Sequence, residues 1–261
     1  MKALHAIAAA VLAATSLAAQ AVGQRADISI YDRATHRELP VYWHEGRAYV
    51  VGRPGNEYQV MLRNKIGEDL LAVVSVDGLN VMNGQPASAR QSGYIVAPWT
   101  RIDVRGWRKS MEEVASFYFT QLSDSYAGRT GRPDNVGVIG VALFQRKRVE
   151  PPPPAAAADP APYRSAPFNR ERAEASGDSA NESRAKSLQA PAASAPLGTG
   201  HGRREESRVQ WQQFERSTDA PVETIAIYYD SYRNLVAQGV LQAPLGRRDP
   251  NPFPTAFTPD P

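Results

Sequence analysis

Cysteine is absent from the 261 residues of this chain, and this absence restricts both its stability and its chemistry. No disulfide can form, and thiolate catalysis, cysteine-ligated zinc and iron–sulfur clusters are excluded. The fold must therefore be stabilised by a hydrophobic core, and the chain is long enough to bury one.

A large excess of charge of one sign is absent as well. Lysine and arginine total 30, aspartate and glutamate total 27, and the formal net charge at pH 7 is +3. The basic residues form no run interleaved with aromatic residues, a pattern expected of nucleic-acid-binding surfaces. We therefore expect no nucleic-acid partner.

Long apolar runs are confined to the N-terminus. Lys2 precedes an apolar stretch over residues 6–19, which is too short to span a bilayer comfortably, and Ala19 and Ala21 are small residues where a signal peptidase cleaves. We therefore expect residues 1–21 to be a signal peptide and the mature protein to be periplasmic or secreted, with no membrane span. An uncleaved N-terminal anchor is the alternative.

Short segments with the alternation of β-strands fill residues 22–149. Asp77-Gly78 is a dipeptide favoured in two-residue hairpins, and residues 44–47 predict a second turn. Phe117 and Phe119 share one face of their segment and are expected in the core. The spacing predicts an all-β fold, an antiparallel β-sandwich with Ig-like or barrel-like topology. Its clearest strand segments are DISIYD, EYQVMLRN, DLLAVVSV, VASFYFTQL and NVGVIGVALFQ.

The composition changes abruptly after this domain. Residues 150–197 are mostly proline, alanine, serine and charged residues, with too little apolar surface to fold, and they predict a disordered linker. Residues 198–243 contain three strand-like segments, which we expect to dock on the first sheet because three strands alone are marginally stable. Proline-rich residues 244–261 predict a disordered tail. The three segments are SRVQWQQFE, ETIAIYYDS and NLVAQGVLQA.

The stretch Gly198-Thr199-Gly200-His201-Gly202, followed by Arg203 and Arg204, is the most motif-like part of the chain. Its spacing matches neither the dinucleotide-binding G-x-G-x-x-G nor a P-loop, which needs a lysine and a hydroxyl residue after its last glycine. We interpret it as the hinge at which the linker re-enters the folded domain. A nest of backbone amides that holds an anion beside the two arginines is the alternative.

No catalytic or metal-ligating constellation is recognisable, so we assign no catalytic residue, no metal and no cofactor. His36, His44 and His201 show no ligand spacing, and the nucleophile motif GxSxG is absent. Residues 124–135 predict a long loop that carries Tyr126, Arg129 and Arg132, which could meet a carboxylate, a phosphate or a peptide backbone. A plain connecting turn is the alternative. The candidate binding residues are Tyr126, Arg129, Arg132, His201, Arg203 and Arg204.

Several segments resemble a group of exported proteins from Gram-negative proteobacteria. The resemblance covers most of residues 27–146 and 197–242, and it implies a periplasmic or cell-envelope setting. No activity is assigned to that group, so no catalytic residue carries over from it. The segments are VVSVDGLNVMNG, GWRKS, DSYAGRTGRPDNVGVIGVALF, LGTGHGRRE and YYDSYRNLVAQGV.

Three functional hypotheses follow. The leading one is a non-enzymatic β-sandwich protein of the cell envelope that binds another protein or an envelope polymer. The second is an envelope hydrolase or metal-dependent enzyme that uses His201 with carboxylates from elsewhere in the chain. The third is a small-ligand binder with an aromatic cleft around Trp43, Trp99 or Trp107, of which the last two are expected on the same face of one strand.

Overall fold

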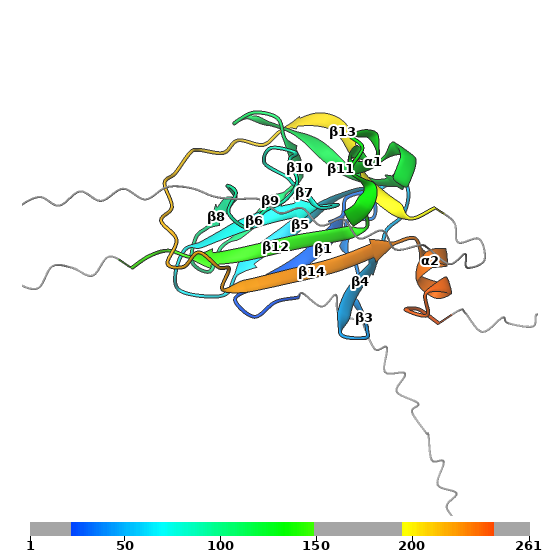
Figure 1. Cartoon of the computed structure of the whole chain (residues 1–261), viewed down its shortest axis with the longest axis horizontal. Coiled ribbons are helices and arrows are strands. Elements are labelled where there is room, and N and C mark those ends of the chain that lie inside the picture. Colours follow the sequence, from blue (N-terminus) through cyan, green and yellow to red (C-terminus); the bar gives the residue numbers. More distant parts are fainter. Residues whose placement is uncertain (1–21, 149–194, 243–261) are drawn as a thin grey trace, which may run out of the picture. The chain divides into compact units, whose positions relative to one another are not determined.

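The computed structural model describes residues 22–148 and 195–242, which form two β-sheets around a main hydrophobic core. This architecture confirms the predicted all-β sandwich (Figure 1). The predicted signal peptide and tail, and nearly all of the predicted linker, lie outside the described residues. No helix among the described residues is both long and apolar enough to cross a membrane.

Sheet A has seven strands and is antiparallel throughout. Its main path runs β10-β11-β5-β1-β2, with β13 beside β11 and β9 beside β5. The strands are β1 (Ala26–Asp32), β2 (Arg37–Glu38), β5 (Glu57–Asn64), β9 (Arg101–Val104), β10 (Gly106–Arg108), β11 (Glu113–Gln121) and β13 (Leu197–Glu206).

Sheet B also has seven strands, in the path β3-β4-β14-β12-β6-β7 with β8 beside β6. Only the pairing of β14 with β4 is parallel. Figure 1 shows β12 and β14 side by side, with β1 of sheet A behind them. The strands are β3 (Tyr42–His44), β4 (Arg47–Val51), β6 (Leu70–Val76), β7 (Leu79–Asn80), β8 (Tyr94–Val96), β12 (Val138–Gln145) and β14 (Glu223–Asp230).

The segment from 195 to 242 supplies one strand to each sheet. β13 lies at an edge of sheet A, whereas β14 lies between β4 and β12 inside sheet B. The prediction that C-terminal strands dock on the first sheet is confirmed for the segment that forms β14, which is a central part of the sandwich. Without it, β4 and β12 would lose their common neighbour.

Two-residue turns connect two of the strand pairs. Asp77 and Gly78 join β6 to β7 with φ of 52° and 73°, and Glu45 and Gly46 join β3 to β4 with φ of 48° and 73°. Positive φ at both central positions is the requirement of the tight hairpin turn that matches strand twist. Both turns therefore form where the sequence predicted them.

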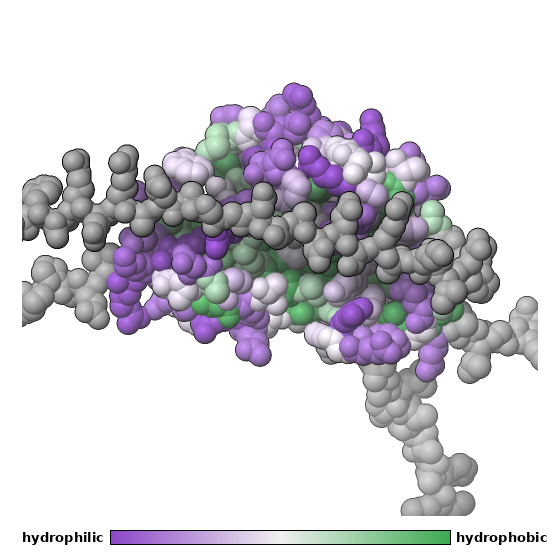
Figure 2. Space-filling view, in the orientation of Figure 1, coloured by the Kyte–Doolittle hydropathy of each residue, from purple (hydrophilic) through white to green (hydrophobic). Residues whose placement is uncertain are grey.

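Aromatic side chains from both sheets fill the core. Phe117 and Phe119 stack on Tyr58 at centroid distances of 5.4 and 4.3 Å, and all three are fully buried. Leu71, Val73 and Phe144 form a second, smaller cluster that packs against Ala89, Ile95 and Phe214. Hydrophilic residues cover most of the face shown in Figure 2, with hydrophobic areas exposed between them.

Local capping overrides the strand that was predicted over residues 234–243. The chain forms helix α2 (Tyr232–Ala237) instead, because the Ser231 hydroxyl accepts a hydrogen bond from the Asn234 amide and caps the N-terminus. Gly239, at φ of 76°, lies just after the helix, where a left-handed residue favours termination. The strand expected over residues 207–215 is also wrong, because this segment has no regular secondary structure.

Residues 124–135 are more ordered than the predicted loop. They contain helix α1 (Tyr126–Arg129) and 3-10 turn η2 (Pro133–Asn135), and turn η1 (Leu122–Asp124) precedes them. The Ser125 hydroxyl caps α1 by accepting a hydrogen bond from the Gly128 amide. This cap fixes the position of Tyr126, the first residue of the helix.

Candidate functional site

The glycine-rich stretch is a strand and not a hinge, since β13 pairs with β11 along its whole length. Its glycines alternate and share one face. An added Cβ would lie 2.6 Å from Ser125 at position 198, 2.2 Å from the Tyr118 ring at position 200 and 2.4 Å from Ser116 at position 202. Glycine is required at these positions because the neighbouring residues pack directly on the backbone.

A β-bulge in β13 separates the two arginines that follow the glycines. The register shifts so that Phe117 of β11 faces His201, whereas Ala115 faces Arg204. His201 and Arg204 therefore lie on the core-facing side of sheet A, because both of their partners are core residues. The extra residue of the bulge allows Arg203 to face the opposite side.

Arg203 and Arg132 hold other parts of the sandwich and do not join His201. The Arg203 guanidinium donates to both carboxylate oxygens of Glu57 at 2.9 and 3.1 Å, and this bond lowers the pKa of Glu57 against the effect of burial. The Arg132 guanidinium donates to the carbonyl oxygen of Gly84 at 2.9 Å. These two predicted site residues thus have structural partners.

Three other predicted residues, Tyr126, Arg129 and Arg204, act on the imidazole of the fourth, His201. The ring of Tyr126, from α1, lies 5.6 Å from the imidazole between centroids. Burial lowers the pKa of His201, and the positive charges of Lys109, Arg129 and Arg204 lower it further. Positive charge therefore accumulates around an imidazole whose protonation it disfavours.

The surroundings of His201 do not favour the hydrolase hypothesis. Among residues 22–148 and 195–242, no carboxylate is hydrogen-bonded to His201, and the charged groups that perturb its pKa are all cations. The same residues contain no group of three or more histidines and carboxylates placed to hold a metal ion. A general base oriented by an acid, which hydrolytic histidines need, is thus not assembled here.

The three tryptophans proposed for an aromatic cleft differ in burial. Trp107 is buried in the core, where its indole nitrogen donates to the carbonyl oxygen of Gly200 at 3.1 Å. Trp43 and Trp99 are exposed. The expected shared face of Trp99 and Trp107 is wrong, because Trp99 lies before β9 at φ of 60° and the chain is interrupted at Arg105. The alternation of one strand therefore does not connect them.

A fourth tryptophan, Trp211, belongs to an irregular segment that we call the strap, residues 207–216. The first anchor of the strap is β10 and the turn that follows it. The amides of Ser207 and Val209 donate to the carbonyl oxygens of Glu112 and Met111, at 2.6 and 2.8 Å. The Arg108 guanidinium also donates to the carbonyl oxygen of Ser207.

The second anchor of the strap is on sheet B. The Arg216 guanidinium donates to the carbonyl oxygens of Ala89 and Gln91 at 2.7 and 2.6 Å and lies 4.0 Å above the ring of Phe144. The Arg146 guanidinium donates to the carbonyl oxygen of Gln213 at 3.2 Å. The strap is therefore held at both ends by charged hydrogen bonds to backbone oxygens.

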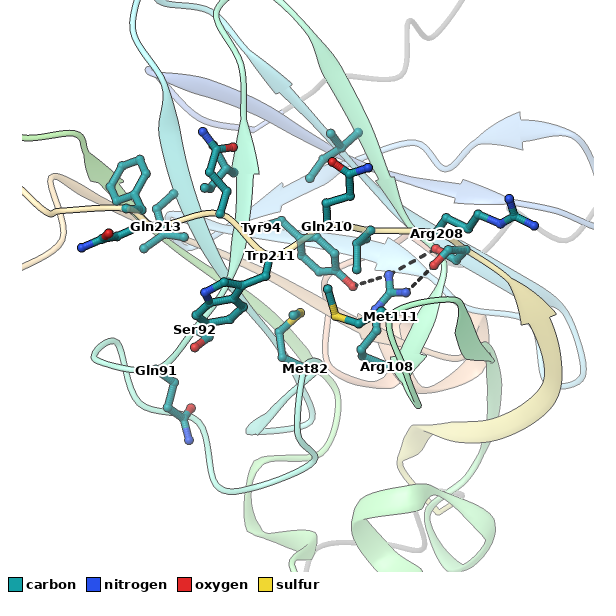
Figure 3. A pocket seen from close by; sticks show the side chains of 18 of the residues that line it. Met82, Gln91, Ser92, Tyr94, Arg108, Met111, Arg208, Gln210, Trp211 and Gln213 are labelled. Atoms are coloured by element: carbon teal, nitrogen blue, oxygen red, sulfur yellow. Dashed lines mark hydrogen bonds between the residues drawn. The ribbon is translucent and has the colours of Figure 1, made fainter.

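Between these anchors the strap crosses a groove of about 1320 Å³. Within the described chain, Gln210, Trp211 and Gln212 make no hydrogen bond, and Trp211 is 77% exposed. Trp211 points from the strap to the side on which Met82, Met111 and Tyr94 lie, as Figure 3 shows. One wall of the groove is therefore apolar and consists of methionine and aromatic side chains.

One border of the groove is β9, through Ile102 and Asp103. β9 pairs with β5 on one side, and in the described part of the chain no strand occupies its other side. Charged residues in the lining are mainly cationic. They are Arg90, Arg105, Arg108, Arg208 and Arg216, against Asp103 and Glu206.

A buried hydrogen-bond network joins the two sheets elsewhere in the sandwich. The Asp77 carboxylate accepts from the Tyr229 hydroxyl at 2.5 Å and from the amides of Gly137 and Thr199 at 3.0 and 2.8 Å. The Thr199 hydroxyl lies 2.6 Å from both the Tyr229 and the Tyr58 hydroxyls. Burial raises the pKa of Asp77 to about 6, although all three bonds to its carboxylate oppose this change.

Comparisons with protein-family models, curated proteins and solved structures return no match to this chain.

Proposed function

We propose that this protein is an exported, non-enzymatic binding module of the cell envelope, whose ligand is an extended polypeptide segment lying in the groove beneath the strap. The observation that carries the proposal is Trp211. An indole that is 77% exposed, on a span held only at its ends, leaves a large apolar surface in water opposite Met82 and Met111. A ligand between these side chains would cover that surface.

The size of the groove supports a chain-like ligand. At about 1320 Å³ it exceeds the roughly 300–1,000 Å³ typical of small-molecule pockets. The open side of β9 provides backbone donors and acceptors for an added strand, as in β-augmentation. Methionine and aliphatic side chains favour the apolar side chains of a peptide, and methionine is enriched on surfaces that accept varied peptides.

The charge of the groove favours a ligand with acidic residues. Arg90 and Arg105 line it, and within the described residues neither guanidinium has an acidic partner. Arg108 and Arg216 are engaged by backbone oxygens, which carry no full charge. An extended peptide that alternates apolar and acidic residues would match both the methionine wall and the arginines.

The test uses a short peptide of alternating valine and glutamate, titrated into the full chain and read by fluorescence and amide hydrogen exchange. We expect saturable binding, protection of β9 amides, and at least a roughly 10-fold loss of affinity in Trp211→Ala, because exposed aromatics are common binding hot spots. Trp43→Ala is the matched control, since Trp43 is an exposed tryptophan of β3, outside the groove.

Three outcomes would refute the proposal. One is the absence of binding by this peptide and by its lysine-containing counterpart. Another is equal affinity in the Trp211 variant. The third is binding of a neutral oligosaccharide in place of the peptide, which would assign the groove to an envelope polymer.

A further inference from the structure

We propose a second binding site, separate from the groove, in which His201, Arg204, Lys109 and Arg129 hold a phosphate-type oxyanion. It lies on the core-facing side of sheet A, at the end that α1 covers. The groove contains none of these four residues, so the two proposals are independent.

Strand register places three of these residues on one face. Trp107 of β10 and Arg204 of β13 both face Ala115, on either side of β11. Trp107 and Ala115 are buried in the core, so Arg204 shares the core-facing side, and His201 joins it opposite Phe117. Lys109 follows Trp107 by two residues. Its amide donates to the carbonyl oxygen of Glu113, so the pairing of β10 with β11 continues as far as Lys109. Alternation therefore puts Lys109 on the side of Trp107.

Helix α1 closes the site from above. The Tyr126 ring lies 4.8 Å from Trp107 and 5.6 Å from His201 between centroids, so the first turn of α1 lies over both. Arg129, at the other end of this short helix, is near enough for its charge to act on His201. Cations from β13, α1 and the turn after β10 thus converge on one imidazole.

Two carboxylates share this face, those of Glu113 and Glu206, and Glu206 is paired with Arg208 at 2.6 Å. Arg204 has Glu113 at 3.5 Å, and both side chains are exposed. Lys109 and Arg129 have no ion-pair partner among the described residues, and no carboxylate acts on His201. An N–H of the imidazole can donate to a bound anion while the three cations balance its charge. A phosphate group, free or on a lipid, has this chemistry.

The experiment follows the His201 imidazole by NMR in the full chain, with His201→Asn identifying its signals and those of His36 and His44 as references. Addition of inorganic phosphate is expected to raise the pKa of His201 saturably, because a bound anion stabilises the imidazolium. In Lys109→Gln/Arg129→Gln the pKa of His201 is expected to rise without phosphate, and affinity for phosphate to fall about 10-fold or more.

Arg37→Gln/Arg53→Gln is the matched control, since it removes the same charge from two exposed positions on other elements. A response to phosphate that never saturates means an adventitious ion only, and would overturn the proposal. Equal affinity in the Lys109/Arg129 variant and the control would do the same. Vesicles of phosphatidylglycerol, against phosphatidylcholine, distinguish a lipid headgroup from free phosphate: stronger binding to the former assigns the lipid source.

Discussion

Replacing Asp77 by asparagine is expected to change how the stability of this protein depends on pH. Asp77 is almost fully buried in the hairpin between β6 and β7, where burial raises its pKa from 3.8 to about 6. The folded protein therefore holds a proton on Asp77 more tightly than the unfolded chain does. Neutral Asp77 favours folding, and this contribution is complete below about pH 4 and lost as the pH rises through 6.

The size of the effect follows from the two pKa values. Their difference corresponds to roughly 3 kcal/mol, of which about 2–3 kcal/mol is lost between pH 4 and pH 7.5. Asparagine tolerates the φ of 52°, so the turn is retained. Its single carboxamide oxygen cannot accept from both the Gly137 and Thr199 amides, and leaving one buried N–H without an acceptor costs about 1–3 kcal/mol at any pH.

The measurement is urea unfolding of the wild type and Asp77→Asn, at several values between about pH 4 and pH 7.5, followed by tryptophan fluorescence. The variant is expected to be less stable at the acidic end and equal or more stable at the neutral end. Asp124→Asn, which removes an exposed carboxylate, serves as the control. A stability difference that stays constant with pH, or that turns against the variant as the pH rises, would refute the reasoning.

Two further predictions concern the C-terminal segment. Gly198→Ala brings a Cβ within 2.6 Å of Ser125 and 2.9 Å of Val136, so it should cost about 1–3 kcal/mol in urea unfolding, whereas Gly67→Ala, with its nearest neighbour at 3.8 Å, should not. A chain that ends at Arg148 lacks β14 and should show no cooperative unfolding until a peptide of residues 195–242 is added. Near-UV circular dichroism would report the transition. Cooperative unfolding of the truncated chain alone would contradict this prediction.

Much of sheet A and sheet B could be read from local patterns. The alternation that marks β5, β11 and β14, and the Asp77-Gly78 turn, depend on neighbouring residues alone, which is why they were predictable. The helix at Tyr232–Ala237 was missed because its apolar residues also fit a strand, and the Ser231 cap was the signal that distinguishes them.

The glycine-rich stretch shows why part of the site was out of reach. The alternation of its glycines is visible in the sequence, but glycine has no side chain and therefore shows no polar or apolar face. A hinge and a strand could not be distinguished on that basis. Tyr126 and His201 were both selected as site residues, but 75 positions separate them in the sequence. Their contact exists because α1 packs on β13 after the chain has passed through β12 and a long intervening segment.

The sequence by itself determined the absence of thiol chemistry, the β-strand content and the turns, since each depends on composition or on residues adjacent in the chain. Only the tertiary structure decided which strands became neighbours, that β14 lies inside sheet B, and that the strap with Trp211 crosses a groove. These are contacts between distant segments, and they depend on how whole faces pack together. For that reason the groove and the cationic cluster around His201 emerge only in the folded protein.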